Sequence, residues 1–375
     1  MNLTSASDAL LLVDGKQAFC EILRRIRSAQ RSILINMFIW RDDGIGGRIA
    51  AALLAAADRG VRITIVKDRY GIVCELCEEG RRSFFHPHPT LFERLSIASL
   101  VLLYNPDLAG RLPRGKTNPL ARRLRAHPNV TVLDGENRYD HSKYYVFDDE
   151  TLIFGGVNIE DKENGQDRQG RRYRDYMIEV NDRQAVARFL QKREDPACDG
   201  GMFVVNRKAP QRVFEIEARF LSLIGSAEKE LTILMAYFSP RKEFLEAIAR
   251  ACARGVRVRV VVPRSANFTD DTNKRTLTAL SRIRKNPPAL YLSERMLHAK
   301  LLMSEREITL GSCNITKKAF RQLDELNGFF PNDDSALASA VRASVEETIR
   351  GAHRVRRRGE LRHRRLFALA EGILM

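Results

Sequence analysis

Cysteine is scarce in this chain of 375 residues, which contains six. Cys74 and Cys77 form a single CxxC pair, whereas a structural zinc ion usually needs four ligands. His86 and His88 follow closely, but their spacing matches no usual zinc pattern. We therefore interpret the cysteines as reduced, unpaired thiols of a cytoplasmic protein and predict no metal site from them.

Long hydrophobic runs are also absent. No stretch of about 18 apolar residues occurs, and Asp14 interrupts the short apolar run near the N-terminus. We therefore expect neither a transmembrane helix nor a secretory signal. Any association with a membrane should be peripheral, on the inner surface facing the cytoplasm.

Acidic residues are outnumbered, because 63 Lys and Arg stand against 47 Asp and Glu and give a net charge of +16. Such a field favours polyanionic partners, namely nucleic acid, an anionic membrane surface or phosphorylated substrates. The charge does not choose among them. It is uneven, since residues 350–365 contain eight arginines and one acid.

An internal repeat is the strongest organisational signal. In each half a helix, a buried strand, an alanine-rich helix ending at Arg-Gly and a second strand follow one another. This order predicts an α/β fold of two pseudo-symmetric domains, residues 1–205 and 206–340, each with a largely parallel sheet. The matching segments are 16–30, 31–40, 46–60 and 61–68 in the first half and 212–228, 231–240, 243–255 and 256–263 in the second.

Two segments fall outside the repeat. Residues 71–135 are an insert that either shapes substrate access or contributes only a solvated basic helix at 118–126. After a predicted helix at 336–350, the arginine cluster is followed by Leu366, Phe367 and Leu369. We interpret residues 341–375 as a basic helical tail that lies on an anionic membrane; a disordered tail, or one that binds nucleic acid, is the alternative.

A second repeated element carries the chemistry. HSKYYVFDDETLIFGGVN begins at residue 141, and HAKLLMSEREITLGSCN begins at residue 298. Both contain His-x-Lys, an acid five residues after the lysine, an apolar strand and Gly-small-x-Asn. The shared positions are His141, Lys143, Asp148, Gly155, Gly156 and Asn158 in the first copy and His298, Lys300, Glu305, Gly311, Ser312 and Asn314 in the second.

Strand geometry predicts how these residues meet. Alternate residues of a strand share a face, so the histidine and lysine should project together. The next strand should pair back across a turn and bring the asparagine beside them, with small residues whose backbone N–H groups approach a bound group closely. Each half thus offers an imidazole, an ammonium group, an amide and backbone donors.

This set suits a phosphate ester. The lysines would neutralise the phosphoryl oxygens, and Asn158, Asn314 and Ser312 would donate hydrogen bonds to them. One imidazole can attack phosphorus while the other protonates the leaving oxygen. No triad of carboxylates for a catalytic metal stands at these positions, so we predict chemistry without a metal or other cofactor.

The two segments resemble the HxKxxxxD…GSxN signature of the phospholipase D superfamily, over roughly residues 15–335. The chain is most similar to the two-copy bacterial branch of cardiolipin synthases and related phosphatidyltransferases, as Leu34–Trp40, residues 57–61 and Arg174 with Asp175 also suggest. The resemblance implies two α/β/α sandwich domains with one active site at their interface. It also implies a two-step mechanism through a phosphohistidine.

Carried over residue by residue, the resemblance makes His141 the nucleophile and His298 the general acid, with the lysines and asparagines around the phosphoryl group. It also implies a carboxylate behind each histidine: Asp175 fits the first copy and Glu325 the second, the alternative being solvated salt bridges. Asp148 and Glu305 look structural, at the turns. Gly156 stands where serine is usual, so we expect a weakened phosphate contact there.

Three functions remain open from the sequence. The first is a phosphatidyltransferase that passes a phosphatidyl group from an anionic phospholipid to another lipid hydroxyl, forming cardiolipin, or to water. The second is a metal-independent nuclease or other phosphodiesterase acting on nucleic acid. The third, a basic adaptor without activity, is disfavoured by two intact sets of histidine, lysine and asparagine. Two motifs in one chain also predict a monomer.

Overall fold

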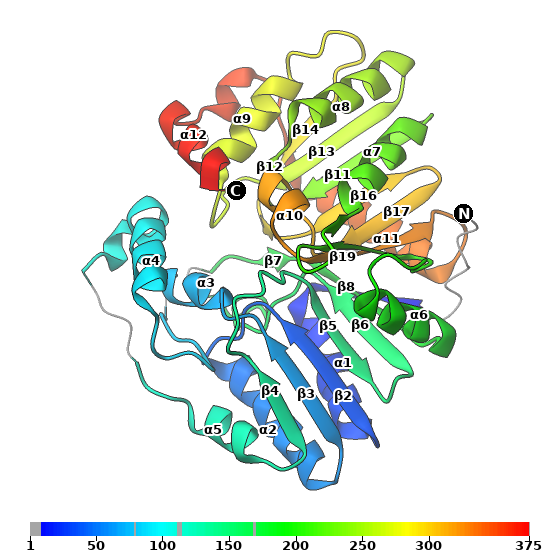
Figure 1. Cartoon of the computed structure of the whole chain (residues 1–375). Coiled ribbons are helices and arrows are strands. Elements are labelled where there is room, and N and C mark those ends of the chain that lie inside the picture. Colours follow the sequence, from blue (N-terminus) through cyan, green and yellow to red (C-terminus); the bar gives the residue numbers. More distant parts are fainter. Residues whose placement is uncertain (1–8, 79, 111–114, 168–169, 375) are drawn as a thin grey trace.

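The computed structural model describes residues 9–78, 80–110, 115–167 and 170–374, so residues 1–8 of the first predicted domain lie outside the described residues. Two large β-sheets dominate the fold, with helices around them (Figure 1). The first sheet consists, from edge to edge, of β1 (Ala9–Val13), β8 (Tyr176–Val180), β6 (Thr151–Gly155), β5 (Lys143–Phe147), β2 (Ser32–Met37), β3 (Arg62–Lys67) and β4 (Val130–Leu133).

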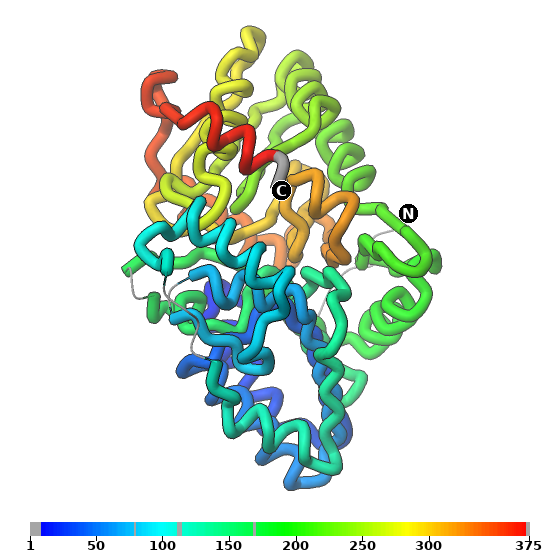
Figure 2. The backbone as a smooth tube through the Cα atoms, turned by 60° about the vertical axis from the view of Figure 1, so that its left-hand side comes forward, coloured from blue at the N-terminus to red at the C-terminus, as the bar shows by residue number. Residues whose placement is uncertain are grey.

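The second sheet repeats this arrangement and extends it at both edges. Its strands are, in order, β10 (Val213–Phe214), β9 (Phe203–Arg207), β19 (Glu325–Pro331), β17 (Glu307–Gly311), β16 (Lys300–Ser304), β11 (Glu230–Met235), β13 (Arg257–Pro263), β14 (Ala289–Ser293) and β20 (Ala352–Arg354). Figure 2 shows the first half of the chain, in blue to green, below the second half, in green to red.

Each large sheet is mixed, so the predicted largely parallel arrangement is wrong. Strands β2, β3 and β4 pair in parallel, as do β11, β13 and β14. The strand after each His-x-Lys motif, β5 or β16, instead runs antiparallel to the central strand and continues into a hairpin. Strands joined by a tight hairpin must be antiparallel, and the strands between each hairpin and the β1 or β10 edge continue the antiparallel pairing.

The predicted repeat is confirmed within a few residues. Helix α1 (Asp14–Ser28), β2, α2 (Gly44–Asp58) and β3 match α7 (Ile216–Ser226), β11, α8 (Lys242–Arg254) and β13. The two Arg-Gly ends also match: Gly60 and Gly255 have φ values of 95° and 96°, which glycine adopts at low cost. The arginine before each glycine donates to carbonyl groups at the end of α1 or α7 and so ties the two helices together.

A hydrophobic core shared by both sheets joins the halves. Side chains from β5, β6 and β8 meet side chains from β16, β17 and β19 there, flanked by α6 (Arg183–Glu194) and α11 (Ala336–Arg350). Strands β5 and β16 are buried along their whole length, because helices cover the other face of each sheet. Helices α1, α2 and α5 (Pro119–Ala126) cover the first sheet, and α7, α8, α9 (Asp270–Leu280) and α10 (Lys317–Arg321) cover the second.

The insert and the tail both fold against this frame. The insert contains α3 (Gly71–Cys77), α4 (Leu91–Tyr104), η1 (Pro106–Leu108) and α5, the last of which matches the predicted helix at 118–126. In the tail, β20 pairs with β14, η2 (Arg358–Leu361) follows, and α12 (Arg365–Leu374) packs on α9. The alternative of a disordered tail is therefore wrong for residues 350–374. Within the described ranges, no helix combines the length and apolar character needed to cross a bilayer.

The acids at the two motif turns are structural, as predicted. The Asp148 carboxylate accepts hydrogen bonds from the backbone N–H groups of residues 30, 31 and 32 at 2.9, 2.7 and 2.8 Å. Glu305 accepts from those of residues 228, 229 and 230 at 2.9, 3.2 and 3.2 Å. Each acid thus anchors the connection between a repeat helix and its central strand.

We expect Asp148→Ala and Glu305→Ala each to lower the free energy of unfolding by about 1–3 kcal/mol, because three backbone donors lose a charged acceptor. Chemical denaturation measures the change. The exposed Asp334 offers a control, since Asp334→Ala should stay within about 0.5 kcal/mol of the unsubstituted protein. Equal stabilities for all three variants would contradict the anchoring role.

Candidate active site

His141 meets an acid of the other half through a short parallel bridge. Asp140, directly before His141, bridges to Asp324, directly before Glu325. The backbone N–H of His141 donates to the Asp324 carbonyl at 2.8 Å. The Nδ1 atom of His141 then lies 3.0 and 3.1 Å from the two carboxylate oxygens of Glu325.

A second short parallel pairing holds His298, and it joins this histidine of the second half to an acid of the first half. Strand β15 (Met296–Leu297), directly before His298, pairs in parallel with β7 (Tyr173–Arg174), directly before Asp175. The backbone N–H of His298 donates to the Arg174 carbonyl at 2.8 Å. Its Nδ1 atom lies 2.8 Å from Oδ2 of Asp175.

The acids are therefore exchanged between the halves. Assigning Asp175 to His141 and Glu325 to His298 was the expectation from each copy alone, and this pairing is wrong. The reason is the pair of bridges, which align each histidine with the acid-bearing strand across the junction. Both carboxylates are buried, so the alternative of solvated salt bridges is wrong as well.

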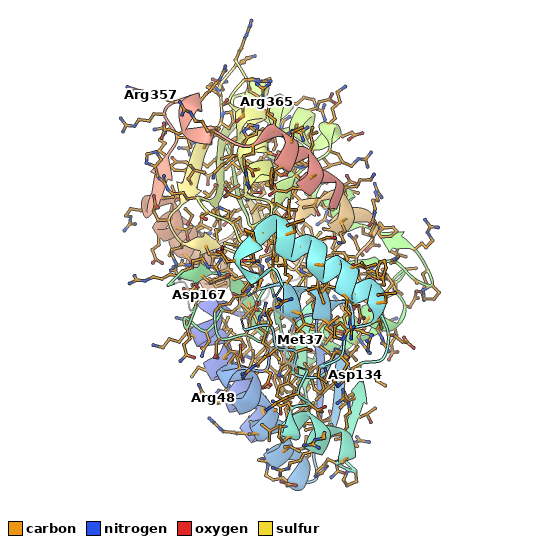
Figure 3. The ribbon with its side chains drawn as sticks, turned by 90° about the vertical axis from the view of Figure 1, so that its left-hand side faces the viewer. Met37, Arg48, Asp134, Asp167, Arg357 and Arg365 are labelled. Atoms are coloured by element: carbon orange, nitrogen blue, oxygen red, sulfur yellow. The ribbon has the colours of Figure 1, made fainter. Side chains whose placement is uncertain are left out.

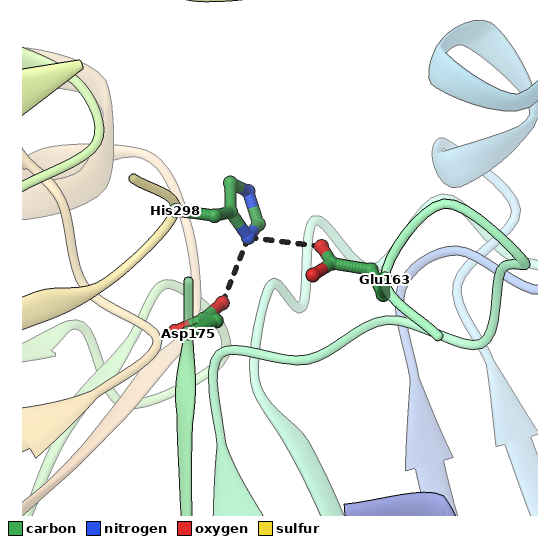
Figure 4. Close-up of side chains that lie close together, drawn as sticks. All are labelled: Glu163, Asp175 and His298. Atoms are coloured by element: carbon green, nitrogen blue, oxygen red, sulfur yellow. Dashed lines mark hydrogen bonds and ion pairs between the residues drawn. The ribbon is translucent and has the colours of Figure 1, made fainter. Parts of the chain in front are cut away.

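Glu163 is a second acid on His298 that the sequence did not reveal (Figure 4). Its carboxylate lies 3.1 Å from Nδ1 of His298, and its side chain is 1% exposed. Glu163 stands five residues after Asn158, whereas Ala319 occupies the matching position after Asn314. The repeated motif ends at Asn158 and Asn314, so it does not include Glu163. A difference between the two copies five residues later, Glu163 against Ala319, was the signal that the sequence offered.

The two lysines of the motifs lie behind the histidines. Lys143 Nζ donates to the backbone carbonyl of His141, and Lys300 Nζ donates to that of His298. Both lysines are fully buried, and burial lowers the pKa of Lys143 to about 7. They are placed to act on the site through their charge.

The hydrogen-bond donors of Gly156 and Ser312 are satisfied by other groups of the protein. The N–H of Gly156 donates to the Tyr176 carbonyl at 3.0 Å, and that of Ser312 donates to the Leu326 carbonyl at 2.9 Å. The Ser312 hydroxyl donates to Glu325. The expectation that these two residues offer free donors to a phosphate is wrong, because sheet pairing takes the backbone groups and the acid takes the hydroxyl.

One cavity of about 270 Å³ joins the site residues of both halves. His141, His298, Asn158 and Asn314 all border it. Lys318 also borders it, on α10, with Nζ 3.2 Å from the Tyr70 hydroxyl. Much of the remaining wall is apolar and comes from Phe38, Val73, Leu100, Phe268 and Leu323.

The two imidazoles differ in proton affinity. Burial, followed by the nearby lysine ammonium groups, holds the pKa of His141 well below its usual value. Burial and Lys300 also lower the pKa of His298, but Glu163 and Asp175 outweigh them and raise it overall. His141 is therefore the imidazole that favours its neutral form, and His298 is the one that binds a proton more readily.

Glu163, Asp175 and His298 also form a cluster whose ligand atoms lie within 4.8 Å of one another. Such a group could hold a metal ion in principle. Here Nδ1 of His298 is hydrogen-bonded to Asp175 at 2.8 Å, and a Glu163 oxygen lies 3.1 Å from the same nitrogen as an ion-pair contact. The six cysteines are unpaired.

We expect Gly156→Ala to detach Asp175 from His298. A Cβ atom at Gly156 would lie 2.4 Å from both Asp175 carboxylate oxygens, so the acid must move and its hydrogen bond must lengthen. The pKa of His298 should fall, as measured by NMR titration of its imidazole. The control is Gly225→Ala, whose Cβ would meet nothing within 4 Å. Identical titrations in both variants would refute this account.

Comparisons with known proteins identify the family of the chain. The family model for "Cardiolipin synthase, PLD-like domain" matches residues 22–194 and 220–348. Cardiolipin synthase B of Shigella flexneri is 27% identical over 323 residues, covering 81% of this chain and 72% of that protein. Cardiolipin synthase A of Pseudomonas syringae pv. syringae (strain B728a) is 25% identical over 376 residues, covering 94% and 72%.

The fold recurs in a solved structure. The crystal structure of phosphatidylserine synthase from Haemophilus influenzae Rd KW20 superimposes with a TM-score of 0.70 at 15% sequence identity, covering 100% of this chain and 93% of that one. This likeness confirms the predicted two-domain α/β fold. With a family model spanning both halves, the chain belongs to the cardiolipin synthase, PLD-like domain family and is an enzyme of the phospholipase D superfamily.

Proposed function

We propose that the protein is a phosphatidyltransferase of the cardiolipin synthase type. It takes a phosphatidyl group from an anionic phospholipid and passes it to the hydroxyl of another lipid, or to water. The observation that carries the proposal is the convergence of two imidazoles, each with a buried carboxylate from the opposite half, on one cavity. The membership of the chain in a cardiolipin synthase family supports the choice of substrate.

The unequal histidines support a division of labour. Neutral His141 attacks phosphorus through Nε2, the bond from phosphorus to the leaving oxygen breaks, and imidazolium His298 gives its proton to that oxygen. A phosphatidyl group is then bonded to His141. In the second step His298 removes the proton of the acceptor hydroxyl, whose oxygen attacks phosphorus and releases His141.

The surroundings serve both steps. Glu325 and Asp175 orient the imidazoles through Nδ1 and leave Nε2 facing the cavity, as an acid behind a catalytic histidine does. Lys300 and Lys318, together with Lys143 in its protonated form, supply positive charge where the phosphoryl oxygens become more negative. This side-chain field takes the role of a metal ion, so we propose catalysis without metal or cofactor by a single chain.

The side chains that line the cavity favour a lipid over a polynucleotide as the substrate. The polar side chains of the site, such as His141 and His298, share its lining with aromatic and aliphatic side chains, among them Phe38, Val73 and Phe268. Apolar walls suit acyl chains and glycerol backbones, whereas single-stranded nucleic acid is bound in basic grooves with stacked bases. We propose that the enzyme works at the inner membrane surface as a peripheral protein.

We expect purified protein to convert vesicles of labelled phosphatidylglycerol to cardiolipin or phosphatidic acid in the presence of EDTA. His141→Ala and His298→Ala should each reduce the rate by at least about 1000-fold, because each removes a chemical group that reacts. Plasmid DNA is the parallel substrate. Nicked DNA without lipid turnover, or full activity in either histidine variant, would refute the proposal.

The charge balance around His298 predicts a pH effect. A general acid must be protonated, so activity should fall as pH rises through the raised pKa of His298. Glu163→Gln removes one of the carboxylates that raise this pKa, and the alkaline limb of kcat/KM should therefore move to lower pH. Glu160→Gln, which changes an acid paired with Arg41 instead, is the matched control. An unmoved limb in Glu163→Gln would contradict the role of His298.

A further inference from the structure

Helix α4 is apolar on two faces. Its sequence, LFERLSIASLVLLY, contains only two charged residues. One face is packed: Ile97 and Val101 are buried in a cluster with Tyr237 and Phe268 of the second half. A helix that is apolar all round is normally enclosed by protein or by lipid.

The other face of α4 is uncovered in the described part of the chain. Leu91, Phe92, Leu95 and Leu102 are 76%, 66%, 62% and 73% exposed. Leu91, Leu95 and Leu102 follow helical spacing and so share one face. Exposed apolar residues are ordinary when scattered, but a contiguous group marks an interaction site.

Helix α12 extends this surface. Leu366 and Leu369 on α12 are 81% and 50% exposed. Figures 2 and 3 place the red α12 next to the cyan α4 on the same side of the molecule. Tyr104 at the end of α4 contacts Phe268 with ring centroids 5.0 Å apart, Phe268 leads into α9, and α12 packs on α9.

The surface lies at the rim of the active-site cavity. Ser96, Ser99, Leu100 and Tyr104 of α4 line that cavity together with the two catalytic histidines. The inner face of α4 is therefore a wall of the site, and its outer face is the exposed apolar group. A lipid lying against the outer face would have to pass only the edge of one helix to reach the site.

The exposed charged residues on α4 and α12 are basic. The acids of the two helices, Glu93 and Glu371, are each 1% exposed. Arg94 on α4 and Arg365 on α12 are exposed. Further exposed arginines precede α12, at positions 354, 356, 357, 358, 362 and 364, and Figure 3 labels Arg357 and Arg365 at this end.

We propose that α4 and α12 form a docking face, composed of Leu91, Phe92, Leu95, Leu102, Leu366 and Leu369, that enters the interface of an anionic phospholipid bilayer. The arginines around it contact the lipid phosphates, and the leucines reach the acyl region. The cavity rim is thereby held against the bilayer, and a phospholipid enters the site along α4. The function of the docking face rests on the proposed phosphatidyltransferase activity, whereas its binding to vesicles does not.

The test measures sedimentation with vesicles of phosphatidylcholine containing phosphatidylglycerol, and turnover of the same vesicles and of a soluble short-chain phosphatidylglycerol. Leu95→Gln with Leu102→Gln should weaken vesicle binding and vesicle turnover at least about tenfold and leave turnover of the soluble lipid within about twofold. Leu91→Gln with Leu366→Gln, one change on each helix, should do the same. Arg362→Gln with Arg365→Gln should weaken binding only at low salt.

Leu10→Gln is the control, because this leucine is 53% exposed and lies on β1, at the edge of the first sheet opposite to β4 and outside α4 and α12. If both double leucine variants of the docking face bind vesicles as well as the unsubstituted protein does, the proposal is overturned, and a protein partner is left as the occupant of this face. The proposal would also be overturned if these variants lost turnover of the soluble lipid as much as turnover of the vesicles, since the leucines would then have only a structural role. Absence of lipid turnover in the unsubstituted protein would refute the proposed function, and the binding comparison would still decide the docking face.

Discussion

The exchange of carboxylates between the two halves is the constraint on which the rest of the site depends. Each imidazole reaches its orienting acid only because a short parallel bridge crosses the junction, Asp140 to Asp324 on one side and β15 to β7 on the other. A shared hydrophobic core beneath the bridges holds the sheets in the alignment that they need. Neither half could orient its own histidine, so the site exists only when both halves fold against each other. This dependence explains why one cavity is bordered by both copies.

Symmetry builds the site, and a departure from symmetry gives the two histidines different proton affinities. The turn after the first asparagine places Glu163 against His298, whereas the matching turn of the second copy has Ala319 there and Lys318 on the cavity wall. The result is two imidazoles of different proton affinity that border the same cavity. The proposed transfer uses this difference, because a nucleophile needs a free electron pair and a general acid needs a proton. The fold supplies equivalent positions, and residues a few positions after each motif make the surroundings of the two histidines unequal.

Most of the fold could be predicted from the sequence, because hydrophobic periodicity and the repeat specify local structure. The Arg-Gly helix ends, the central strands and the turn acids Asp148 and Glu305 lie where their patterns place them. Predictions failed where a residue depends on a partner far away in the chain. How the strands pair across the molecule is not contained in any local pattern. That pairing decides which acid meets which histidine, which strands run antiparallel, and where the hydrogen-bond donors of Ser312 go. Glu163 was missed for the same reason, since its contact spans the junction.

NMR titration of the histidines in Asp175→Asn and Glu325→Gln tests the crossed arrangement most directly. The imidazoles of His141 and His298 are assigned from the single histidine substitutions, and their pH dependence is then followed in each acid variant. The account predicts that Asp175→Asn lowers the pKa of His298 and leaves the His141 signals almost unchanged, and that Glu325→Gln perturbs His141 instead. Perturbation of His141 by Asp175→Asn and of His298 by Glu325→Gln would show that each acid serves its own half and would contradict the account.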